Sequence, residues 1–171
     1  MVIRDAYPHE LVEIGELRLA SYRADGFLAP DSSYARRLRE LGSDGLGVVL
    51  VAVDSDGGLL LGTVMLQTWP NAGHVVHGPG EGEIRALAVR PEAQGFGVGR
   101  ALLRAVINRA VREGIRHLLL GTQPDMKAAQ RLYAEAGFSR MPERDWSPAI
   151  HEPLLAYGLL LGAAEASNAA V

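Results

Sequence analysis

The chain has 171 residues, of which 48% are hydrophobic and 22% charged, so we expect one globular core rather than disorder or a fibrous repeat. Its net charge of −3 comes with basic residues that are scattered along the sequence, which argues against a nucleic-acid-binding surface. The absence of cysteine excludes disulfides, thiolate metal ligands and a cysteine nucleophile.

The sequence also indicates how the chain is organised. No apolar run is long enough to span a bilayer, and the first residues lack the apolar core of a signal peptide. We therefore expect a cytoplasmic protein without a membrane partner. A single domain is expected over residues 1–162, followed by a frayed Ala-rich tail over residues 163–171.

The pattern of apolar residues predicts the helices and strands. Strands are expected where β-branched or aliphatic residues alternate or run together, and helices where apolar residues recur every three or four positions. Serine, aspartate and glycine mark several helix ends. In chain order we predict a strand at residues 2–6, a helix at 8–23, a helix from Ser32 or Ser33 to Leu41, strands at 47–53, 59–69 and 83–89, a helix at 98–113, a strand at 115–121, a helix from Asp125 to Ala136, a strand from Phe138 and a strand at 154–161.

The order of these elements indicates the fold class. Turn residues at positions 54–58 favour an antiparallel hairpin between the second and third strands. Residues 71–82 are rich in Gly, His and Pro and predict a loop before the central strand. Strands and helices then alternate. We expect an α/β (α+β mixed) fold, with a partly antiparallel sheet and helices on both faces.

A glycine-rich segment joins the central strand to the helix at residues 98–113. Gly95, Gly97 and Gly99 let the backbone approach an anion closely, and the helix start adds the positive end of its dipole. The segment suits a phosphate or pyrophosphate, although a structural turn is the simpler alternative. A free-nucleotide site is disfavoured, because the third glycine comes one place too early for a dinucleotide fingerprint and no Walker Gly-Lys-Ser/Thr follows.

The same segment resembles the signature of the GNAT acyltransferases, in which Arg or Gln precedes a Gly-x-Gly/Ala pair, here Gln94, Gly97 and Gly99. A second stretch is similar to a later helix of the family, with Tyr133 followed by a Gly-Phe pair. The resemblance implies the GNAT fold, a central mixed, mostly antiparallel sheet of six or seven strands flanked by about four helices. In one departure, Met126 stands where many members carry a cofactor-contacting Asn.

The resemblance further implies an acyl-CoA-dependent N-acyltransferase, specifically an acetyltransferase. Such an enzyme would transfer an acetyl group from acetyl-CoA to a primary amine of a small molecule or a protein, by direct attack in a ternary complex and without a metal. A homodimer would use the final strands. The alternative from another class is a domain that binds acyl-CoA and regulates or assembles without turnover.

Within this interpretation three groups serve the chemistry. The backbone N–H of Leu87 would hold the thioester oxygen, Tyr133 would protonate the leaving thiolate, and Glu83 is the candidate general base. The structural alternatives are a half-buried tyrosine with its hydroxyl in water and a surface glutamate. The Leu87 side chain is expected in the core. The residues expected to contact CoA are Leu87, Ala88, Val89, Gln94, Gly95, Phe96, Gly97, Val98, Gly99, Arg100 and Tyr133.

The predicted loop at residues 71–82 contains two histidines, His74 and His77, which compete with Glu83 for the role of base. The two have no further clustered ligands, so they do not indicate a metal site. Trp69 and Trp146 are candidates for the walls of an acceptor pocket, with burial in the core as the alternative.

Overall fold

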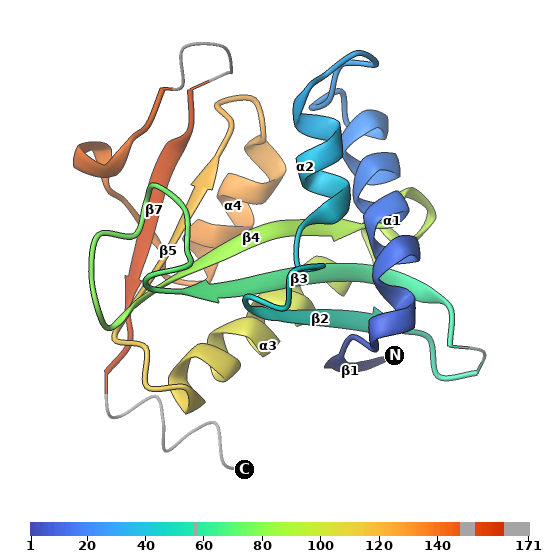
Figure 1. Cartoon of the computed structure of the whole chain (residues 1–171), viewed down its shortest axis with the longest axis horizontal. Helices are drawn as coiled ribbons and strands as arrows, with labels where there is room; N and C mark the ends of the chain where they lie inside the picture. Colours follow the sequence, from blue (N-terminus) through green and yellow to red (C-terminus); the bar gives the residue numbers. More distant parts are fainter. Residues whose placement is uncertain (57, 148–152, 163–171) are drawn as a thin grey trace. The chain divides into compact units, whose positions relative to one another are not determined.

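A computed structural model describes residues 1–56, 58–147 and 153–162 (Figure 1). The predicted tail at residues 163–171 lies outside the described residues. The elements, in chain order, are β1 (Val2–Asp5), η1 (Pro8–Glu10), α1 (Leu11–Ala24), α2 (Tyr34–Glu40), β2 (Val48–Val53), β3 (Leu60–Thr68), β4 (Glu81–Val89), η2 (Pro91–Ala93), α3 (Val98–Arg112), β5 (His117–Thr122), α4 (Lys127–Glu135), β6 (Ser139–Arg140), η3 (Pro142–Arg144) and β7 (Leu155–Leu160), where η denotes a 3-10 helix.

The strands form a seven-stranded sheet in the order β1-β2-β3-β4-β5-β7-β6. β1 pairs antiparallel with β2, and β7 pairs antiparallel with both β5 and β6. β4 and β5 run parallel, with Glu81 opposite His117 and Glu83 opposite Leu119. The predicted fold class, a mixed and mostly antiparallel sheet with about four helices, is confirmed.

The chain divides into two compact units, one of residues 1–65 with 86–105 and one of residues 66–85 with 106–171. In the first unit, Ile14 and Leu17 of α1 are buried against the odd-numbered valines of β2, because residues three apart on a helix and two apart on a strand share a face. The fully buried Arg18 donates from Nη1 to the carbonyl oxygen of Leu41 at 2.6 Å. This bond satisfies a carbonyl at the end of α2.

The second unit packs the loop before β4 onto β5 and β7. Val75 and Val76 of this loop are buried with Leu119 of β5 and Ala156 of β7. β5 itself is mostly buried, as expected for a strand that has a neighbour on each side. The apolar side chains of the loop therefore pack against β5 and β7, and its polar groups are available for other contacts.

Three details of the predicted elements are wrong. The helix expected at residues 8–23 is divided into η1 and α1. β4 begins at Glu81, two residues earlier than expected, because its first residues pair with β5. The N-cap of α4 is Met126 rather than Asp125, whose carbonyl oxygen accepts a bond from the N–H of Lys127 at 2.7 Å.

Candidate active site

The glycine-rich loop has the geometry expected of an anion site. Gly95 and Gly97 have φ angles of 81° and 82°, a left-handed conformation that glycine adopts without strain. A Cβ at either position would meet nothing within 4 Å, so the space beside the backbone is open. α3 begins directly afterwards at Val98, and the first N–H groups of a helix lack intrahelical acceptors. The loop therefore offers open space and backbone N–H groups to an anion, and its assignment to the diphosphate of CoA stays a prediction.

Gln94 fixes the start of this loop. Its Nε2 donates to Oδ2 of Asp25 at 3.2 Å and to the carbonyl oxygen of Val89 at 3.4 Å. The side chain thus ties the loop to the end of β4 and to the turn after α1. Sequence analysis missed Asp25, because nothing local marks a partner that lies 69 residues away.

Side-chain exposure separates two kinds of predicted CoA contact. Gly95, Gly97 and Arg100 are exposed, and Phe96 is 81% exposed at the tip of the loop. The side chains of Ala88 and Val98 are buried, so these two residues could reach a ligand only through their backbone. Val89 and Gly99 are half-buried.

The backbone of β4 departs from the extended conformation next to Leu87. Ala86 has a φ of 50°, which is uncommon for a residue with a Cβ and costs on the order of 1 kcal/mol. The peptide between Ala86 and Leu87 carries the N–H that was predicted to hold the thioester oxygen. Leu87 itself is half-buried, so the expectation that its side chain belongs to the core is wrong. The sequence did not predict this positive φ, because alanine has no preference for it.

Glu83 is a buried carboxylate on β4. Burial raises the pKa of this carboxyl above its ordinary value, and this effect outweighs the opposing influences of Arg85, the Gly73 N–H and His74. The Gly73 N–H donates to Oε2 of Glu83 at 2.6 Å, and Nε of Arg85 lies 3.9 Å from the same oxygen. The environment is thus the desolvated one that a general base requires. Its assignment as base stays a prediction.

Tyr133 lies on α4 and is buried rather than half-exposed. Its ring packs against those of Phe138 and Tyr157, with centroids 6.0 Å and 6.4 Å away. Burial raises the pKa of its phenol, so the group holds a proton throughout the neutral range. The alternative of a hydroxyl in water is therefore wrong, whereas the role of general acid stays a prediction.

The predicted residues fall into the two compact units. Leu87 and the segment 94–100 belong to the first, and Glu83 and Tyr133 to the second. β4 runs from one unit into the other and carries both Glu83 and Leu87, four positions apart.

Three of the histidines and tryptophans named above, His74, His77 and Trp146, have partners in the second unit. The ring of His74 stacks on that of Trp146, with centroids 4.0 Å apart and planes inclined by 14°. The backbone N–H of His77 donates to Oε2 of Glu81 at 2.7 Å, and Trp69 is 46% exposed. Within the described ranges, no three His, Asp or Glu side chains gather as a metal site would require, and no helix is long and apolar enough to cross a membrane.

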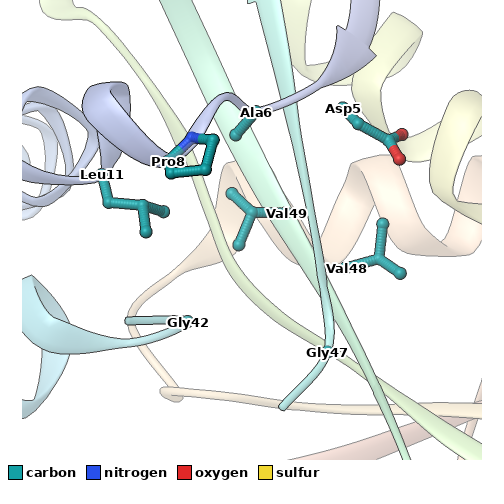
Figure 2. Close-up of a pocket in the computed structure, with 8 residues that line it drawn as sticks. All are labelled: Asp5, Ala6, Pro8, Leu11, Gly42, Gly47, Val48 and Val49. Atoms are coloured by element: carbon teal, nitrogen blue, oxygen red, sulfur yellow. The ribbon is translucent and has the colours of Figure 1, made fainter. Parts of the chain in front are cut away.

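A hollow of about 190 Å³ lies in the first unit, between β1, η1 and β2. Figure 2 shows Pro8, Leu11 and Val49 on one side of β2 and Asp5 on the other. Its lining includes none of the predicted site residues. The hollow is therefore not part of the predicted site.

Comparison with curated proteins identifies similar sequences. The model of the acetyltransferase (GNAT) family matches residues 11–138. A mycothiol acetyltransferase of Kocuria rhizophila is 37% identical over 97 residues, which make up 57% of this chain and 31% of that protein. The chain thus spans about a third of the length of such relatives.

Solved structures share the fold. An acetyltransferase of the GNAT family from Staphylococcus aureus Mu50 has a TM-score of 0.74 at 18% identity, over 94% of this chain and 99% of that one. A putative acetyltransferase from Salmonella typhimurium, solved with its cofactor acetyl-CoA, has a TM-score of 0.66 at 24% identity, over 95% and 94%. The family match extends from the start of α1 to the end of the Tyr133 helix and the Gly-Phe pair behind it. The chain therefore belongs to the acetyltransferase (GNAT) family.

Proposed function

We propose that the protein transfers an acetyl group from acetyl-CoA to a primary amine by direct attack in a ternary complex. The observation that carries this proposal is the open, left-handed glycine pair at the start of α3, found in a chain of the acetyltransferase family. The name of the Kocuria relative and the acetyl-CoA complex of the Salmonella protein support the choice of acyl donor. CoA, when bound, supplies a thioester whose carbonyl carbon accepts the amine.

The chain's own groups would then serve three needs. The N–H of Leu87, directed by the conformation of Ala86, donates to the carbonyl oxygen as negative charge develops there. Glu83 takes the proton of the attacking amine through water. Tyr133 gives its phenolic proton to the sulfur as the carbon–sulfur bond breaks. The phenol is protonated at neutral pH, as its ordinary pKa of about 10 already requires, and burial makes it hold this proton more tightly.

The groups around Glu83 indicate the class of the amine acceptor. A buried carboxylate next to Arg85 and close to the His74–Trp146 stack offers both a proton acceptor and an aromatic surface. A small primary amine or an exposed amine of a protein fits these groups. Mycothiol acetyltransferases resemble part of this chain, so amines related to mycothiol are the first acceptors to assay.

Calorimetric titration with acetyl-CoA tests the binding step. In Gly97→Asp a carboxylate enters the open space beside the loop, and repulsion between it and the phosphates should weaken binding by roughly tenfold or more. The matched control is Gly45→Asp, since Gly45 has a φ of 73° and equally open surroundings but lies outside the loop. Equal losses in both variants, or no binding by the unaltered chain, would contradict the assignment.

Turnover distinguishes an enzyme from a domain that only binds acyl-CoA. Tyr133→Phe removes the phenolic proton and keeps the packing against Phe138 and Tyr157, so we expect kcat to fall by roughly 100-fold with little change in acetyl-CoA affinity. The measurement is thiol release from acetyl-CoA in the presence and absence of an amine. Tight acetyl-CoA binding without amine-dependent thiol release from any acceptor would favour the binding domain.

A further inference from the structure

The loop between β3 and β4 is clamped by Arg144, which follows it by more than 60 residues. Nη1 of Arg144 donates to the carbonyl oxygen of Val75 at 2.7 Å. The same guanidinium forms a two-pronged ion pair with Glu81, at 3.0 Å from Nη1 to Oε2 and 2.8 Å from Nη2 to Oε1. Oε2 of Glu81 also accepts the N–H of His77 at 2.7 Å. The loop is therefore held at Val75 and at His77 by one ion pair.

This ion pair is well shielded from water. The side chains of Arg144 and Glu81 are only 15% and 14% exposed, and two-pronged Arg–carboxylate bonds are among the strongest in proteins. The pKa of Glu81 is lowered to about 2, chiefly by its bonds to Arg144. The clamp thus persists over the whole range in which an enzyme would work.

A second attachment comes from the same segment. The ring of Trp146 stacks on that of His74, and Trp146 is itself fixed by two backbone bonds with Leu154, at 3.1 Å and 2.8 Å. Residues 144–146 thus hold the loop at positions 74, 75 and 77. Gly73 directly precedes these positions, and its carbonyl oxygen accepts the N–H of Val76 at 3.2 Å.

We propose that Arg144 is a positioning residue, which fixes the loop so that the Gly73 N–H stays on the Glu83 carboxylate and sets the pH at which Glu83 accepts a proton. The inference rests on the proposed function only in so far as Glu83 is the base. Its structural part, the link from Arg144 through the loop to Glu83, stands on the bonds of one compact unit.

The groups that face Glu83 decide the direction of the effect. Arg85 on β4, the Gly73 N–H and His74 favour the ionised carboxylate, while burial disfavours it. β3 contributes the neutral amide of Gln67, which accepts a bond from Arg85, and β5 contributes the aliphatic Leu119. Two of the three stabilising groups therefore sit on the clamped loop. Release of the loop should make Glu83 harder to ionise.

The test removes the ion pair between Arg144 and Glu81. Arg144→Met alone leaves the Glu81 carboxylate without its partner and could unfold the chain. The double variant Arg144→Met/Glu81→Gln removes both charges, so it is measured beside the single variant. The matched control is Arg4→Met/Glu10→Gln. Arg4 forms a similar two-pronged pair with Glu10 at 2.9 Å and 2.7 Å, and Oε2 of Glu10 also accepts a backbone N–H, that of Tyr7, but this pair belongs to the other compact unit.

Two readouts separate the inference from the proposed function. The first is the ¹³C NMR titration of the Glu83 carboxyl without substrate, assigned with Glu83→Gln; we expect its midpoint to move up by about one pH unit in the Arg144 variants and to stay in place in the control. The second is the low-pH limb of kcat, which should move by the same amount.

The outcomes are distinct. An NMR midpoint that stays unchanged, or moves down because water enters, would overturn the positioning role of Arg144 whether or not the protein has activity. If the NMR midpoint moves but the low-pH limb of kcat does not, the positioning role of Arg144 stands and Glu83 is rejected as the base.

Discussion

Burial gives Glu83 two linked properties, a raised affinity for protons and a cost to stability. A carboxyl whose pKa is higher in the folded than in the unfolded chain binds protons more tightly when folded. Its contribution is therefore most favourable below the unfolded pKa of about 4.3, and it is lost as the pH rises through the folded pKa. At neutral pH the ionised carboxylate destabilises the fold, which is a common feature of catalytic groups.

Glu83→Gln should therefore lower activity and raise stability at the same time. We expect kcat to fall by roughly 100-fold or more because the base is lost, and the unfolding temperature at pH 7 to rise. The gain in stability should vanish near pH 4, where the carboxyl of the unaltered chain is protonated. Thermal melts at pH 4 and pH 7 and steady-state rates would measure both effects.

The exposed Asp56, in the turn after β2, offers a control. Asp56→Asn also removes one negative charge. It should change neither kcat nor the difference between the unfolding temperatures at pH 4 and pH 7. A Glu83→Gln variant that melts at a lower temperature at pH 7 would contradict the stability argument.

Single residues differ in how far the sequence revealed them. Glu83 and Tyr133 were singled out because they stand at fixed offsets from motifs in the chain, and their catalytic roles stay predictions. Ala86 and Arg144 could not. Alanine has no preference for a positive φ, and the partners of Arg144 lie on a loop that only the folded chain brings close.

At the scale of elements, the loop between β3 and β4 contributes more than a connection. Its apolar residues pack against β5 and β7, and its backbone N–H at Gly73 donates to the carboxylate of Glu83. A Cβ added to Gly73 would lie 2.7 Å from Oε2 and 3.2 Å from Oε1 of Glu83. Close approach of backbone and carboxylate thus requires a glycine at this position.

Gly73→Ala should displace the carboxylate or the loop. We expect kcat to fall by about tenfold, because a small misplacement of a catalytic group lowers the rate strongly, with acetyl-CoA affinity unchanged. Gly78→Ala is the matched control in the same loop, since a Cβ there would meet nothing within 4 Å. Equal rates for the two variants would show that the contact at Gly73 does not matter for catalysis.

The elements themselves were largely predictable, and their ends less so. Apolar residues at every second position predicted the strands, and apolar residues at every third or fourth position predicted the helices. Both patterns arise because one face of each element is buried. The early start of β4 escaped prediction, because Glu81 and Gly82 resemble loop residues and enter the strand through pairing with His117 and Leu118. The glycine-rich loop was recognised from its glycines, and two of them, Gly95 and Gly97, have the positive φ that favours glycine.

At the scale of the whole molecule, a shielded two-pronged ion pair is found among the described residues of each compact unit. Glu10 bonds Arg4 in the first unit and Glu81 bonds Arg144 in the second. Both carboxyls have a pKa lowered to about 2, chiefly by their arginine partner. A lowered folded pKa contributes stability that is present above the unfolded pKa and is lost as the pH falls towards 2.

The protein should therefore lose stability between about pH 5 and pH 2. Each carboxyl accounts for roughly 3 kcal/mol of the loss in the free energy of unfolding. The double variant Arg144→Met/Glu81→Gln should lack the part of this loss that comes from Glu81. Urea unfolding at pH 6 and pH 3, for the unaltered chain and the double variant, measures the difference. A double variant with the same pH dependence as the unaltered chain would contradict this account.

The overall architecture followed from the order of elements together with two motifs, and the family match agrees with it. The prediction of a single domain over residues 1–162 stays a prediction. The acceptor could not be derived, because the groups that surround Glu83 come from segments with no motif of their own.

The sheet also bears on how the protein behaves when many copies are crowded together. Its two outermost strands are short: β1 has four residues and β6 has two. Another chain that tried to extend the sheet would find few backbone groups to pair with. Resistance to stacking into fibrils is therefore built into the two ends of the sheet, and lengthening β6 would be the change that puts it at risk.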